Sequence, residues 1–131
     1  MMSVDNGLAD LRSEIRAFYA GFGQPDLLMA AFRNAALYVP LTEDDRICTH
    51  VVGGVRWIGA FTGVEELAGW LAERGVRPDG EYRYHTLLGW RLADCDAGAE
   101  PVGVVVDAMS AAPMAFPPKI DDTELAVDGV R

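Results

Sequence analysis

Residues 55–71 read VRWIGAFTGVEELAGWL, and this stretch decides the fold because it joins a predicted strand directly to a predicted helix. Its first part, residues 55–61, is rich in β-branched and aromatic residues, which is typical of a strand. After Thr62 the apolar residues recur at the spacing of one buried helix face. These apolar residues are Leu67, Trp70 and Leu71. The stretch therefore predicts a strand followed at once by an amphipathic helix.

The start of this helix carries a capping pattern. Thr62 and Glu65 fit a capping box, in which the threonine hydroxyl accepts from a backbone N–H and the glutamate side chain reaches back. Glu65 and Glu66 also fall in the first turn, where the helix dipole favours carboxylates. We therefore expect Thr62 and Glu65 to have a structural role, and Gly75 to end the helix in the left-handed conformation.

A β-hairpin precedes the helix. Residues 46–52 and 55–61 read as its strands, and the glycine pair 53–54 suits the positive φ angles of a two-residue turn. This turn fixes the register, so that His50 lies opposite Trp57 on one face. Because both faces carry apolar residues, the hairpin is expected to be central in its sheet. One face should lie under the helices, and the other should be partly covered or used for contact.

Helices and a strand are predicted before the hairpin. Apolar residues at helical spacing indicate a helix over residues 8–22, with Asp5 or Asn6 as its N-cap. A shorter helix is predicted over residues 25–33, because a proline suits its first position. Residues 36–41 have the β-branched and aromatic content of a strand.

The elements after residue 75 are less regular. Alternating tyrosines favour a strand over residues 81–85, and residues 87–95 suit a short helix with Thr86 as its cap. The continuous apolar run at residues 102–107 is typical of an inner strand that is buried on both faces. Residues 113–118 can add only a brief edge strand, because prolines interrupt them.

Composition favours one domain. The 131 residues are the usual length of a single core, and no linker-like tract divides them. We expect a domain over residues 1–118 and an acidic tail over residues 119–131. The net charge of −9 argues against nucleic-acid binding, which depends on Lys and Arg neutralising phosphates.

The cysteines and the N-terminus indicate a cytoplasmic protein. Cys48 and Cys95 are too few for a disulfide framework, so they are expected to be free, buried thiols. The N-terminal residues lack the basic and apolar pattern of a secretory signal, and no apolar run has the length of a membrane span.

Taken together, residues 31–41 (AFRNAALYVPL), 53–62 (GGVRWIGAFT) and 103–107 (GVVVD) resemble the N-terminal domain of the SseB family. The resemblance covers most of residues 8–118. It implies an α+β fold, with helices packed on a mixed or antiparallel central sheet of about five strands. It carries no catalytic residue onto this chain. In this chain Asp107 and Ala108 replace the family's Asn-Pro after the last strand.

No residue cluster predicts a catalytic, cofactor or metal site. His50 and Cys48 share one hairpin face, but a structural zinc needs four ligands and no second pair lies nearby. Their β-carbons would also be nearly 7 Å apart, about twice the ~3.3 Å rise of a strand residue, too far for a nucleophilic pair. Asp107, at the end of a buried strand, is expected to cap a turn more readily than to serve a reaction.

The remaining candidate is an aromatic contact surface made of His50, Trp57, Tyr82 and Tyr84, since aromatic residues are enriched at interfaces. The leading hypothesis is a non-enzymatic interaction domain that binds a protein partner or a second copy of itself. A homodimer would use an edge strand near Leu37 or Phe116. The alternative hypothesis is a small-molecule or enzymatic domain with a pocket near His85 and Asp107.

Overall fold

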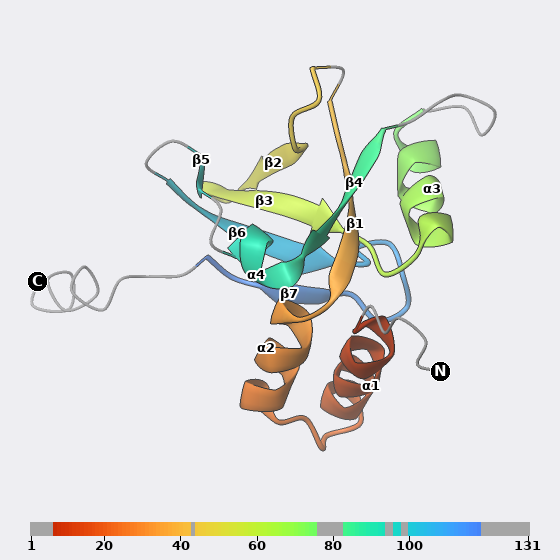
Figure 1. The fold of residues 1–131 in the computed structure, drawn as a ribbon, viewed down its shortest axis with the longest axis vertical. Coiled ribbons are helices and arrows are strands. Elements are labelled where there is room, and N and C mark those ends of the chain that lie inside the picture. Colours follow the sequence, from red (N-terminus) through yellow and green to blue (C-terminus); the bar gives the residue numbers. More distant parts are fainter. Residues whose placement is uncertain (1–6, 43, 76–82, 94–95, 98–99, 119–131) are drawn as a thin grey trace, which may run out of the picture.

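The structure, a computed structural model, describes residues 7–42, 44–75, 83–93, 96–97 and 100–118 (Figure 1). The elements in chain order are α1 (Leu8–Tyr19), α2 (Pro25–Arg33), β1 (Ala36–Pro40), β2 (Thr49–Val52), β3 (Val55–Ala60), α3 (Val64–Glu73), β4 (Tyr84–Leu88), α4 (Gly89–Ala93), β5 (Asp96–Ala97), β6 (Glu100–Val106) and β7 (Met114–Phe116). This order agrees with the predicted one except for the short β5, which lies between the helix predicted over residues 87–95 and the strand predicted over residues 102–107. Tyr82, Cys95 and the predicted tail lie outside the described residues.

Two sheets organise the domain. The larger has the strand order β2-β3-β6-β5, with β7 also pairing with β6, and the smaller contains β1 and β4. Strands β3 and β6 run parallel, whereas β2 and β3 run antiparallel, so the larger sheet is mixed. An isolated bridge between Tyr38 and Phe61 joins the two sheets. The predicted α+β fold with helices on a mixed sheet is therefore confirmed.

The hairpin has the predicted register. Gly53 and Gly54 have φ angles of 61° and 82°, which suit the two-residue turn, and His50 pairs with Trp57. The predicted central position is correct for β3 only, because β2 lies at one end of the described strand order. Strand β2 also begins later than predicted, because the N–H of Cys48 donates to the carbonyl of Pro40 at 3.1 Å.

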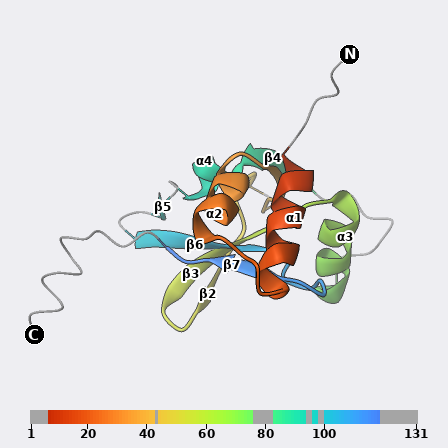
Figure 2. The same cartoon turned by 90° about the horizontal axis from the view of Figure 1, so that it is seen from below.

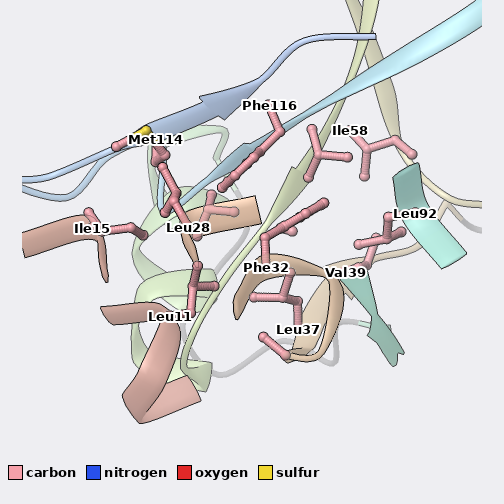
Figure 3. Close-up of a cluster of buried hydrophobic side chains, with 14 of the residues drawn as sticks. Leu11, Ile15, Leu28, Phe32, Leu37, Val39, Ile58, Leu92, Met114 and Phe116 are labelled. Atoms are coloured by element: carbon pink, nitrogen blue, oxygen red, sulfur yellow. The ribbon is translucent and has the colours of Figure 1, made fainter. Parts of the chain in front are cut away.

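One face of the larger sheet is covered by helices (Figure 2). Helices α1, α2 and α4 lie on this side, and their apolar residues meet those of the strands in a single buried cluster (Figure 3). Phe32 of α2 stacks on Phe116 of β7, with ring centroids 4.1 Å apart. Ile58 and Ala60 of β3 belong to this cluster, which identifies their face of the hairpin as the core face.

Several predicted boundaries were wrong, two of them at the starts of helices. Helix α1 has Gly7 as its N-cap, not Asp5 or Asn6. Leu87 and Leu88, expected in a helix capped by Thr86, belong to β4, where Leu87 pairs with Leu37 of β1. Pairing with a distant strand decides their conformation here, since their apolar character fits a helix or a strand equally well.

Candidate functional site

A polar cluster lies where the parallel strands β3 and β6 end. Because the strands are parallel neighbours, their carboxyl ends meet at one edge of the sheet, which places Thr62 beside Asp107. The N–H of Asp107 donates to the carbonyl of Ala60 at 2.9 Å, so the pairing extends one residue past β6. Arg12 reaches the same point from α1. The cluster therefore ties three separate segments of the chain together.

Hydrogen bonds satisfy the buried groups of this cluster. Thr62 is only 2% exposed, and it donates from its N–H to Asp107 Oδ1 at 2.9 Å and from its hydroxyl to Oδ2 at 2.7 Å. The Arg12 guanidinium donates to the Thr62 hydroxyl from Nε at 3.2 Å and from Nη2 at 3.1 Å. Nη2 also donates to the Thr62 carbonyl at 2.9 Å. Each polar group of Thr62 thus has a partner, as a buried residue requires.

The capping role predicted for Thr62 and Glu65 was wrong. Helix α3 has Gly63 as its N-cap, and no side-chain cap bond forms there among the described residues. Thr62 precedes the cap, and its hydroxyl oxygen, the acceptor that a capping box would use, accepts instead from Arg12 Nε at 3.2 Å and Nη2 at 3.1 Å. Glu65 is exposed and keeps only its favourable place in the first helical turn.

Asp107 has a structural role, although not in the manner predicted. Its carboxylate holds Thr62, while its main-chain carbonyl accepts from the N–H of Ser110 at 2.9 Å and from the Ser110 hydroxyl at 2.8 Å. The turn is thus closed by main chain and Ser110. Asp107 has a φ of 52°, a left-handed conformation that aspartate tolerates better than most residues.

A cavity of about 280 Å³ adjoins this cluster, and its polar lining includes Arg12, Arg16, Glu66 and Asp107. A second cavity of about 130 Å³ also borders Asp107. His85 lines neither cavity. Neither of the two is therefore the pocket that was expected beside both His85 and Asp107. Because both carboxylate oxygens of Asp107 already accept from Thr62, the cluster is arranged as a clamp between segments.

The structure brings His50 and Trp57 together on the face of the hairpin opposite the core. The Trp57 ring lies against Gly103 of β6, where an added Cβ would stand 2.5 Å from Cζ3 of the indole. Val52 is 66% exposed, whereas Val55, Trp57 and Val105 are half-buried. Within the described part of the chain, this face is therefore only partly covered. We call His50, Val52, Val55, Trp57 and Val105 the Trp57 face.

Helix α3 borders the Trp57 face through Trp70. The rings of His50 and Trp70 have centroids 5.5 Å apart at 66°, and the Arg74 guanidinium lies 4.0 Å from the Trp70 centroid. Tyr84, also predicted for the contact surface, packs on Tyr38 of β1 and is 40% exposed in the smaller sheet. The predicted surface is thus divided between two sheets.

Burial shifts the pKa of two groups, His50 and Cys48, on which the Arg74 charge also acts. The pKa of His50 is lowered, first by burial and second by the nearby Arg74 charge. Its Nε2 is buried and has no hydrogen-bond partner among the described residues. Burial raises the pKa of the free Cys48 thiol, and Arg74 opposes this rise. Neutral forms are therefore favoured at both positions. In the described part of the chain, no group of three or more His, Cys, Asp or Glu residues could hold a metal ion.

We expect His50 to make stability depend on pH in the acidic range. Because its pKa is lower in the folded state, the unfolded chain binds more protons as the pH falls below about 6.5, the ordinary histidine value. This contribution to stability is therefore intact above that pH and lost below it. Urea unfolding of the wild type and of His50→Gln at pH 5 to 8 measures this effect. The free energy of unfolding should fall less at low pH in the variant than in the wild type. Equal pH slopes would contradict this prediction.

Comparisons with known proteins complete the description of the site. The described helices include none that is both long and apolar enough to cross a membrane. No protein-family model matches the chain, and neither a curated protein nor a solved structure is significantly similar to it.

Proposed function

We propose that this chain is a non-enzymatic interaction domain that binds a protein partner through the Trp57 face. The observation that carries the proposal is a half-buried tryptophan packed against Gly103, flanked by exposed Val52 and half-buried Val55. Aromatic anchors surrounded by apolar residues are typical of the centre of protein interfaces. The face lies on the side of the sheet opposite α1, α2 and α4, so a partner can approach it without disturbing the core.

The position of Trp57 supports the proposal further. Gly103 leaves room for the indole to rest on β6, so the ring is already held in place before any partner binds. Binding then orders fewer side chains, which lowers the entropic cost of association. His50 is held against Trp70 at the border of the same face. We infer a rigid contact surface rather than one that forms on binding.

The relation to the SseB family and the cytoplasmic location are parts of the same proposal, and both rest on the sequence. The homodimer predicted from an edge strand near Leu37 or Phe116 stays a separate prediction, and the present proposal does not depend on it. Strand β1 pairs with β4 and is bridged to Phe61, and Leu37 is completely buried. Phe116 lies in β7 but is only 5% exposed, because it stacks on Phe32 in the core.

The alternative of a small-molecule or enzymatic site near His85 and Asp107 has less support. Both Asp107 oxygens are engaged with Thr62, which leaves the carboxylate poorly placed to act as a base. His85 lies in β4 opposite Val39 of β1. The Trp57 face therefore remains the better candidate.

Affinity capture from a lysate of the source cells tests the proposal. We expect the wild type to retain a defined partner. Trp57→Ala should retain at least about tenfold less of this partner, which is the effect of losing one interface hot spot. Trp90→Ala is the matched control, because Trp90 is 41% exposed on α4, on the helix side of the sheet. Its partner yield should stay unchanged.

A second variant tests whether partner capture depends on the position of the Trp57 ring as well as on its presence. Gly103→Ala keeps Trp57 but pushes its indole away from β6, so it should also weaken capture. Thermal melting must first show that each variant is folded. A partner list that is the same for wild type, Trp57→Ala and Gly103→Ala would remove this face from the proposal.

A further inference from the structure

A second candidate site lies on the opposite side of the sheet from the Trp57 face. A cavity of about 200 Å³ opens between α2, α4 and the strands β6 and β7. It is lined by Met29, Phe32, Arg33, Ala93, Val104 and Phe116, together with one further residue of β6 and the residue that follows β7. We propose that this cavity binds a small, flat aromatic molecule of one or two rings.

The floor of the cavity is apolar and well ordered by packing. Phe32 is fully buried, Val104 is 1% exposed and Phe116 is 5% exposed. The Phe32 and Phe116 rings are nearly parallel, with an interplanar angle of 13° (Figure 3), and both residues line the cavity. A further aromatic ring can pack edge-on against Phe116, the ring of this pair that keeps some exposed surface.

The size and lining of the cavity favour an apolar occupant over water. Water needs two to four polar partners to be held in a buried site, and an apolar cavity of about 150 Å³ can stay dry and bind benzene. Among the side chains that line this cavity, only Arg33 is charged. Transfer of an aromatic molecule from water into such a space is favoured by the hydrophobic effect.

The mouth of the cavity provides access. Met29 is 43% exposed, and its unbranched side chain can change rotamer to admit or enclose a ligand. Arg33 is half-buried beside it. The proposed site does not depend on the Trp57 face, because its buried wall belongs to the core side of the sheet.

Methyl NMR of the whole chain with indole as the probe tests the proposal. Saturable shifts, with a dissociation constant in the millimolar range or tighter, are expected at Met29, Ala93 and Val104. Nuclear Overhauser contacts should join indole protons to the ring of Phe116. Shifts confined to other residues, or no saturable shift in the folded wild type, would overturn it.

Filling the cavity provides the matched variant. Ala93→Leu should weaken indole binding at least tenfold, because the longer side chain occupies the space. Ala72→Leu, at an exposed position of α3, should leave the affinity unchanged. Folded Ala93→Leu that binds indole as tightly as the wild type would contradict the site. If Ala93→Leu does not fold, the wild-type contacts to Phe116 decide alone.

Discussion

Replacing Gly89 with alanine should lower the free energy of unfolding by about 3 kcal/mol, the upper part of the range for overpacked cores. Gly89 is buried at the junction of β4 and α4, and its N–H donates to the carbonyl of Ala35 at 2.9 Å. An added Cβ would stand 1.9 Å from the backbone oxygen of Phe32 and 2.7 Å from its carbonyl carbon.

The neighbouring backbone cannot move aside easily. Phe32 lies in the last turn of α2, is fully buried and is stacked on Phe116, so a shift of its carbonyl would disturb the centre of the core. Relief by rotating a side chain is not available, since the clash is with main-chain atoms. The strain must therefore spread into α2 or α4.

Gly69→Ala is the matched control for this prediction. Gly69 is exposed inside α3, and an added Cβ would meet nothing within 4 Å. Alanine should stabilise this helix by about 0.5–1 kcal/mol relative to glycine. Urea unfolding of both variants gives the comparison. If Gly89→Ala were as stable as the wild type, the β4–α4 junction could not pack as closely on the backbone of α2 as it does in the structure.

Asp107→Ala should also destabilise the protein strongly, by about 3 kcal/mol. It removes the acceptor for both the N–H and the hydroxyl of buried Thr62, and each unsatisfied buried donor costs about 1–3 kcal/mol. Alanine is in addition less tolerant of the left-handed φ of 52° at this position. Chemical denaturation measures the loss.

Asp107→Asn is the control for this second prediction. Asparagine tolerates the left-handed conformation and keeps one side-chain oxygen for the Thr62 N–H, so it should cost about 1 kcal/mol. Combining Asp107→Ala with Thr62→Val should cost less than the sum of the single changes, because the two residues share a hydrogen bond. Additive costs would show that the clamp does not act as a unit.

Much of the fold could be predicted because local patterns and long-range packing agree. The glycine pair at 53–54 fixes the hairpin register, so His50 opposite Trp57 follows directly from the sequence. The apolar run at residues 102–107 predicts an inner strand, and β6 does lie between β3 and the strands β5 and β7. The turn and the apolar run are local features, which can be recognised within a few residues of sequence.

The polar cluster of Thr62, Asp107 and Arg12 could not be predicted, because its residues are far apart in the sequence. Thr62 and Asp107 are 45 positions apart, and they meet only because β3 and β6 pair in parallel. Read locally, Thr62 before a Gly and two Glu residues resembles a cap, and nothing in the nearby sequence reveals a carboxylate on another strand. The same limit applies to Leu87 and Leu88, whose strand conformation depends on β1.

The Trp57 face is best tested by hydroxyl-radical footprinting of the chain with and without its captured partner. We predict that oxidation of Trp57 slows markedly in the complex. Exposed Trp90 should react at an unchanged rate, which provides an internal reference. An unchanged rate at Trp57, with protection appearing elsewhere on the chain, would contradict the proposal that this face binds the partner.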